Sequence, residues 1–170
     1  MPVKAFSIEF KSLSDQGTFS GLASTYGNVD QGSDVCMAGC FSRTLQDGKT
    51  RPLLWQHSAP IGLVTLTDSP EGLLCDGQLS MGVQAAKDAF TLCKDGVVRG
   101  LSIGFQTVKE AFVGEVRQLV EVKLYEVSLT PFPMNELAMV SGVKAVQQQQ
   151  QEKVRLAMKS FRADILAALK

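Results

Sequence analysis

Short stretches of this chain alternate apolar and polar residues with the two-residue period of a β-strand. In residues 3–13, Phe6, Ile8 and Phe10 fall on one face, which predicts a half-buried strand. Turn sequences rich in Gly, Asn, Asp and Pro, among them residues 30–34, separate this stretch from others of the same kind. The pattern predicts further strands at residues 17–26, 52–57, 61–67, 72–80, 100–110 and 115–129.

Two stretches have a helical period instead. Residues 38–46 form a short candidate helix that Asp47-Gly48 stops, and residues 84–94 form a longer one that Asp95-Gly96 ends. Six or more short strands with two interposed helices predict a mostly-β fold with helical decoration. We expect a closed or partly closed β-barrel, with a sandwich as the alternative.

The last part of the chain has a different composition. Residues 147–151 are five consecutive glutamines, and residues 152–170 carry an apolar stripe opposite a mainly basic side, the pattern of an amphipathic helix. We therefore expect a barrel domain at 1–146, a linker at 147–151 and a C-terminal helix at 152–170. The stripe either packs on the body, self-associates or docks on a partner, and it consists of Val154, Met158, Phe161, Ile165 and Leu169.

Length and charge narrow the possible classes. A chain of 170 residues fits one domain, or one domain with a tail. Its 17 basic and 17 acidic side chains balance, so charge provides no argument for binding nucleic acid or an anionic membrane. No stretch approaches the ~20 apolar residues that cross a bilayer, and we expect a cytosolic protein. Its cysteines form no CxxC pair and fit reduced, mostly buried thiols: Cys36, Cys40, Cys75 and Cys93.

The chain has a single histidine, His57, at the end of the predicted 52–57 strand. If the protein uses a serine nucleophile, His57 is the only imidazole that can serve as its base. Ser102 is the best candidate nucleophile, because Gly100 and Gly104 flank it on one strand face and let another backbone approach. The ordinary alternatives are a histidine without a chemical role and a buried serine at a bend in a barrel.

A carboxylate completes this group of candidates. Glu126 lies in the apolar run of the 115–129 strand, on the face that alternation assigns to Leu124 and Ser128. A buried carboxylate needs a partner, which is either an imidazole N–H or the charge of an Arg or Lys.

Other chemistries have weaker support. A thiol dyad would pair His57 with Cys75 or Cys93, but neither cysteine has a glycine on both sides as Ser102 does. The chain contains no P-loop, no dinucleotide-binding fingerprint and no nucleophile elbow, because the G-x-S-x-G letters of residues 100–104 lie within a predicted strand; we expect neither a cofactor nor a metal. A metal site would have to be assembled from the carboxylates Asp30 and Asp34 with Glu71 or Asp76.

A series of short motifs runs along the chain in a specific order: Gly21-Leu22-Ala23-Ser24, Gly27-Asn28-Val29-Asp30, Asp34-Val35, Gly39-Cys40-Phe41, Pro52-Leu53-Leu54-Trp55-Gln56-His57, Ile61-Gly62, Gly72-Leu73, Gly100-Leu101-Ser102-Ile103-Gly104-Phe105, Glu126-Val127-Ser128-Leu129, Pro133-Met134-Asn135 and Ala138. In order and spacing they resemble the prohead (head maturation) proteases of tailed bacteriophages. The resemblance covers roughly residues 5–144.

The resemblance implies a β-barrel serine endopeptidase related in fold to the herpesvirus capsid-assembly protease. It implies that Ser102 is the nucleophile, His57 the base and Glu126 the third member, where the herpesvirus relatives use a second histidine. Those relatives stabilise the oxyanion with an arginine after the third member. Because residues 130–138 contain none, backbone N–H groups near Ser102 or a water are the candidates here.

The resemblance also implies where the protein acts and on what. The expected place is the immature phage head in the host bacterial cytoplasm. The expected substrates are the scaffolding segment of the major capsid protein, free scaffold and the protease itself. The competing interpretation is a non-enzymatic capsid- or scaffold-associated β-barrel protein.

Overall fold

The computed structural model describes residues 16–141, and most of that backbone is β-strand. All of its strands belong to one sheet, in the order β2-β7-β3-β4-β5-β1-β8, with β6 paired to β7. The described helices are α1 (Ser42–Gln46) and α2 (Gln84–Lys94). The strands are β1 (Thr18–Thr25), β2 (Asp34–Cys36), β3 (Thr50–Trp55), β4 (Ala59–Ser69), β5 (Gly72–Leu79), β6 (Gly100–Val113), β7 (Val116–Thr130) and β8 (Val140–Ser141).

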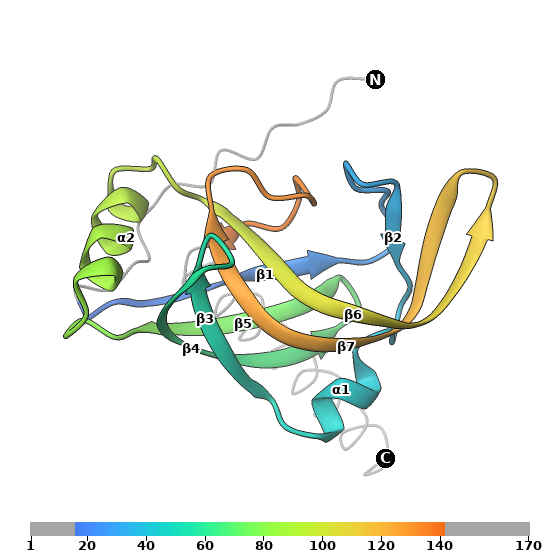
Figure 1. Cartoon of the computed structure of the whole chain (residues 1–170), viewed down its shortest axis with the longest axis horizontal. Coiled ribbons are helices and arrows are strands. Elements are labelled where there is room, and N and C mark those ends of the chain that lie inside the picture. Colours follow the sequence, from blue (N-terminus) through green and yellow to red (C-terminus); the bar gives the residue numbers. More distant parts are fainter. Residues whose placement is uncertain (1–15, 142–170) are drawn as a thin grey trace, which may run out of the picture.

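The sheet is organised around β7. Its 15 residues pair antiparallel with β6 along nearly their whole length. On the other side of β7, β2 pairs parallel with residues 117–119 and β3 pairs parallel with residues 127–129. Figure 1 shows β6 and β7 curving together across the molecule and extending past β2 as a hairpin. Side chains from β3 and β6 thus lie on either side of those from β7.

The sheet curls into a half-barrel, and backbone hydrogen bonds connect its β1–β8 edge to the start of β6. The N–H of Leu101 donates to the carbonyl of Ala138 over 2.8 Å, and the N–H of Val140 donates to the carbonyl of Arg99 over 2.9 Å. Because β8 also pairs with β1, these bonds fix the first residues of β6 just before Ser102.

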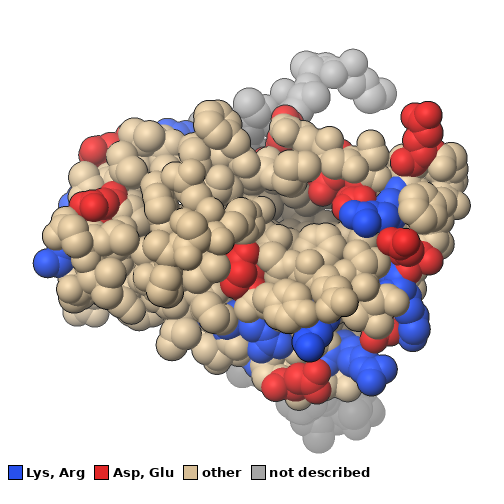
Figure 2. Space-filling view, in the orientation of Figure 1, with Lys and Arg blue, Asp and Glu red and all other residues tan. Residues whose placement is uncertain are grey.

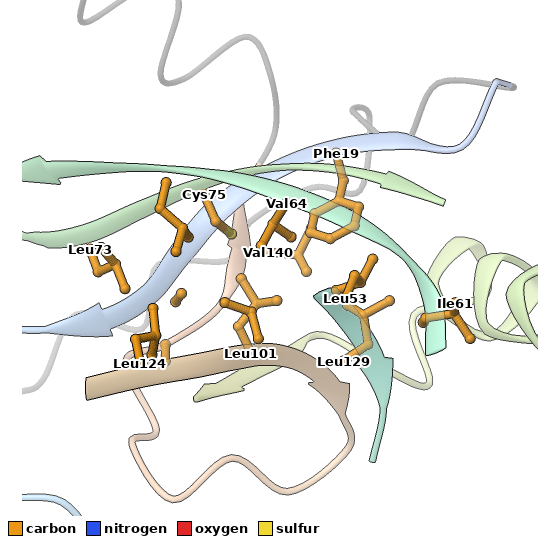
Figure 3. Packing of buried hydrophobic residues seen from close by; sticks show 14 of the residues in the cluster. Phe19, Leu53, Ile61, Val64, Leu73, Cys75, Leu101, Leu124, Leu129 and Val140 are labelled. Atoms are coloured by element: carbon orange, nitrogen blue, oxygen red, sulfur yellow. The ribbon is translucent and has the colours of Figure 1, made fainter. Parts of the chain in front are cut away.

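The concave face of the sheet holds the hydrophobic core. Leu101 and Leu129 are directly paired across β6 and β7, and both are fully buried. Figure 3 shows them among the labelled core side chains, together with Leu53 of β3. Truncating a buried leucine costs about 2–5 kcal/mol, so this face strongly fixes the strands that carry the candidate site. The helix α2 adds the buried residues Ala86, Ala89 and Cys93.

A β-bulge in β7 changes which face its side chains occupy. Glu126 is paired with Gly104, but the following β6 residue, Phe105, is paired with Leu124, so Tyr125 is an extra residue. Leu124 and Val127 both belong to the core cluster, and Glu126, the residue before Val127, therefore points to the opposite face. The expectation that Leu124 and Glu126 share a face was wrong, because strict alternation does not continue through a bulge.

Most of the elements predicted within the described residues are confirmed. The predicted helix at 84–94 is α2 from end to end, and the strand predictions from 17–26 onward correspond to β1, β3, β4, β5, β6 and β7. The predicted strand at 3–13, the linker at 147–151 and the helix at 152–170 lie outside the described residues. Within those residues, no helix has the length and apolarity needed to span a bilayer.

Three local predictions were wrong. The helix predicted at 38–46 is confined to α1, because Gly39 has a φ of +83° that a helix does not allow. The strand predicted at 52–57 ends at Trp55, so His57 lies in the following turn. Residues 30–34 were interpreted as turn, yet Asp34 begins β2, which exists through its pairing with β7.

Candidate active site

His57 lies at the tip of the turn between β3 and β4. The N–H of Ser58 donates to the carbonyl of Trp55 over 3.0 Å, and the two central residues, Gln56 and His57, have φ values of 47° and 58°. Positive φ at both central positions defines a type I′ hairpin turn, which usually carries Asn or Gly there. Other residues lose about 1–2 kcal/mol each in this conformation, so the surrounding structure must hold His57 in it.

The adjoining strand β7 supplies that support. The backbone N–H of His57 donates to the hydroxyl of Ser128 over 3.0 Å, and the N–H of Gln56 donates to the carbonyl of Leu129 over 3.0 Å. These bonds extend the parallel pairing of β3 with β7 past the end of β3. They hold the His57 side chain, which is 47% exposed, beside the face of β7 that carries Glu126.

Glu126 is the partner of this imidazole. Its Oε1 lies 2.6 Å from Nδ1 of His57, and its Oε2 accepts a hydrogen bond from the Ser128 hydroxyl at 2.7 Å. The Glu126 side chain is 11% exposed, so the two bonds give a buried carboxylate the partners that it needs. Because a carboxylate only accepts, Nδ1 is the protonated nitrogen and Nε2 is the basic one.

The two glycines of the candidate site leave room for other parts of the protein. A Cβ at Gly104 would clash with Oε1 of Glu126, so only glycine leaves room at this point of β6 for the carboxylate that contacts His57. A Cβ at Gly100 would lie 2.6 Å from both the Pro133 ring and the Thr130 carbonyl. In both places the protein's own atoms occupy the room that the missing side chain leaves.

Ser102 lies directly opposite Ser128 in the β6–β7 ladder. Residues opposed in this way have Cα atoms about 5.5 Å or less apart and side chains on the same face. No hydrogen bond joins Ser102 to His57 within residues 16–141. Such contacts are often longer in a protein without substrate and tighten when substrate binds. Ser102 also lines a cavity of about 110 Å³.

The structure therefore brings the three predicted residues to one face of three neighbouring strands. Glu126 comes from the middle strand β7, with Ser102 on β6 at one side and His57 just after β3 at the other. Sequence reasoning missed the part played by Ser128, whose hydroxyl contacts both the His57 backbone and Glu126. The available signal was its position two residues after Glu126, which places both side chains on one strand face.

The alternative thiol nucleophiles are poorly suited to react. Cys75 and Cys93 are both buried, and burial raises the pKa of each thiol to about 12. A thiol with such a pKa has almost no thiolate near neutral pH, and the thiolate is the reactive form.

The carboxylates considered for a metal are engaged elsewhere or lie apart. Both oxygens of Asp34 accept hydrogen bonds from Arg117, and Asp76 accepts one from Ser20. Within residues 16–141 no group of three or more His, Cys, Asp or Glu side chains is placed to hold a metal ion.

A half-barrel that places a serine opposite a histidine–carboxylate pair has the parts that serine-protease chemistry requires. Comparison with known proteins agrees with that class. Residues 6–154 match the profile of the family described as caudovirus prohead serine protease, and the chain belongs to this family.

Two curated relatives give the family a more particular context. The chain is 31% identical to the prohead protease of Enterobacteria phage HK97 over 149 residues, which cover 82% of this chain and 65% of that protein. It is also 31% identical to the capsid polyprotein of Pseudomonas phage PAJU2 over 155 residues, which cover 84% of this chain and 22% of that protein. The chain thus spans just under two thirds of the first relative and about a fifth of the second.

Proposed function

We propose that this protein is a serine endopeptidase of phage head maturation, with Ser102 as nucleophile, His57 as general base and Glu126 as the residue that orients His57. The observation that carries the proposal is the 2.6 Å contact between His57 Nδ1 and Glu126, formed one strand away from Ser102. Membership of the prohead serine protease family supports it.

In the proposed mechanism, the Ser102 Oγ attacks the carbonyl carbon of the scissile peptide bond while its proton passes to His57 Nε2. The tetrahedral intermediate then collapses, the C–N bond breaks and His57 gives the proton to the leaving amine. Water, activated by the same imidazole, hydrolyses the acyl-enzyme and returns Ser102 to its starting state. Glu126 stabilises the imidazolium that forms at each proton transfer. Backbone N–H groups near Ser102 or a water would stabilise the oxyanion.

The proposed substrates are the scaffolding segment of the major capsid protein, free scaffold and the protease itself, inside the prohead. The match to a protein named a capsid polyprotein supports an association with capsid protein. The alternative, a capsid-associated barrel without activity, has in its favour the absence of a hydrogen bond between Ser102 and His57 within the described residues.

A serine-directed fluorophosphonate distinguishes the two proposals. We expect the protein to be labelled once, at Ser102, and to shorten its phage's capsid protein when the two are co-expressed. Ser102→Ala and His57→Ala should abolish both labelling and capsid cleavage. Ser20→Ala, which changes a partly buried serine on β1 that hydrogen-bonds Asp76, should abolish neither. Capsid cleavage that persists in folded Ser102→Ala protein would overturn the assignment of the nucleophile, and an unlabelled, inactive wild type would favour the structural protein.

A further inference from the structure

Within residues 16–141, the edge of β6 that faces away from β7 is open beside Ser102. The N–H of Leu101 donates to Ala138, so the backbone groups of Leu101 point away from β7. Because these directions alternate along a strand, the N–H and carbonyl of Ile103 point the same way. Among residues 16–141, no strand pairs with β6 on this side beyond Leu101. An extended peptide can therefore add to this edge as a further strand.

The cavity of about 110 Å³ opens along this edge. Its walls come from β1, β2, β6, β7 and the loops that follow β1 and β7. The apolar part includes Leu101, Ile103 and Leu119, and the polar part includes Asn28, Asp30 and Asn135. Figure 2 shows a hollow in this face of the molecule, next to acidic and basic side chains gathered around β2.

Most polar groups around the cavity already have partners in the protein. Asn28 and Asn135 are hydrogen-bonded to each other and to Thr25, and Asp34 uses both carboxylate oxygens on Arg117. The amide and hydroxyl groups therefore hold the wall together and are poorly available to a ligand.

Asp30 is the exception. Its Oδ1 accepts hydrogen bonds from the backbone N–H groups of Gly32 at 2.8 Å and Asp34 at 2.9 Å. Its Oδ2 accepts no hydrogen bond within the described residues, and the side chain is only partly buried. A residue that lines the cavity thus keeps one carboxylate oxygen without a hydrogen-bond partner among residues 16–141.

The charges nearby do not neutralise Asp30. Arg117 contacts Asp34 at 2.5 Å and Glu110 at 3.6 Å, and it also lies within electrostatic range of Asp30. Three carboxylates therefore surround one guanidinium, and the local charge is negative. A cation entering this cavity gains a partner, whereas an anion meets repulsion.

We propose that this cavity is the specificity pocket of the enzyme and selects a lysine or arginine side chain close to the scissile bond of the substrate. The substrate main chain pairs with the open edge of β6, the aliphatic part of the selected side chain lies against Leu101 and Ile103, and its cationic end reaches Asp30. This inference rests on the proposed protease function, because it assigns the pocket to the substrate of Ser102.

A randomised peptide library, digested by the full-length protein and sequenced by mass spectrometry, identifies the selected position. We expect Lys or Arg to be enriched at one position within a few residues of the cleaved bond. Peptides that differ only there are then compared, with Lys, its neutral analogue norleucine, or Glu. A charge-assisted hydrogen bond predicts a kcat/KM about tenfold higher for Lys than for norleucine, and lower still for Glu.

Asp30→Asn tests the role of Asp30 directly. Asparagine keeps the Oδ1 that caps the turn and removes the charge. The ratio of kcat/KM for the Lys peptide to that for the norleucine peptide should therefore fall to about one. Asp95→Asn removes the same charge at the far end of α2, outside the pocket, and should leave that preference unchanged.

Equal cleavage of the Lys and norleucine peptides by the wild type would overturn the pocket assignment, even if the variant fails to fold. A preference for Lys that survives in folded Asp30→Asn protein would overturn it as well. Phosphonate labelling of Ser102 is measured in parallel. A labelled, active enzyme without the preference refutes the pocket alone, whereas an unlabelled and inactive protein refutes the protease function.

Discussion

At the level of single residues, the hydroxyl of Ser128 joins the two halves of the candidate site. It accepts a hydrogen bond from the backbone N–H of His57 and donates one to Oε2 of Glu126. Ser128→Ala leaves the backbone N–H of His57 and a buried oxygen of Glu126 each short of one partner. We therefore expect kcat to fall about tenfold to a hundredfold with KM nearly unchanged, because Ser128 is fully buried and acts by positioning His57.

The single histidine allows a direct check of this positioning role. The Nδ1 proton of His57 should give one low-field proton NMR signal in the wild type. In Ser128→Ala this signal should broaden or shift, and Ser128→Thr, which retains a hydroxyl, should restore it. Full activity together with an unchanged signal in Ser128→Ala would show that the hydroxyl serves packing only.

Glu126→Gln tests whether the carboxylate orients the base. An amide of the same size can hold the imidazole in the wrong tautomer, and the equivalent change in a known triad costs about 10⁴ in kcat. We expect a loss of this order in steady-state peptide cleavage by folded protein. Glu121→Gln is the matched control, because Glu121 lies on the same strand but pairs with Lys109. If activity per folded molecule survives in Glu126→Gln while stability falls, the catalytic unit is a Ser-His dyad.

At the level of elements, the site depends on how β6 and β7 fit together. Gly104→Ala would put a Cβ on the Glu126 carboxylate, so we expect a loss of about 1–3 kcal/mol of stability and a kcat reduced by at least about tenfold. Gly82→Ala, where an added Cβ meets nothing within 4 Å, should change neither. Thermal unfolding and peptide cleavage measure the two effects. An active, stable Gly104→Ala protein would mean that Glu126 does not need its observed position.

The same elements show how far the sequence could predict the structure. Alternation located the longer strands and helical spacing located α2, because a long amphipathic element carries its own periodic signal. The bulge at Tyr125 and the three-residue strand β2 were missed, because pairing with other strands determines both. The residue types at 57, 102 and 126 were recognisable, but Ser128 acquires its contacts only when β3 and β7 meet. The type I′ turn was equally hidden, because Gln-His is not a sequence typical of it.

At the level of the whole molecule, the sequence pattern of residues 152–170, an apolar stripe opposite a mainly basic side, predicts a binding surface. We predict that residues 152–170 form a helix that docks the enzyme on scaffold or capsid protein, with 147–151 as linker. Deleting 147–170 should leave peptide cleavage largely intact and reduce the amount of protease found in purified proheads. A tail of the same composition with a scrambled order should behave like the deletion. If the truncated protein unfolds, the helix belongs to the core and the docking proposal fails.

The left-handed turn at Gln56 and His57 sets a limit on how the protein can be made more thermostable. Asn or Gly would fit both positions better, but the proposed function needs the imidazole at position 57, so His57 represents a trade-off between stability and function. Gln56→Asn should raise the melting temperature with activity retained, which thermal unfolding and peptide cleavage would show. His57→Gly should relax the same turn and abolish cleavage. Thermostability can thus be raised by substitution at Gln56, whereas the same substitution at His57 would remove the activity.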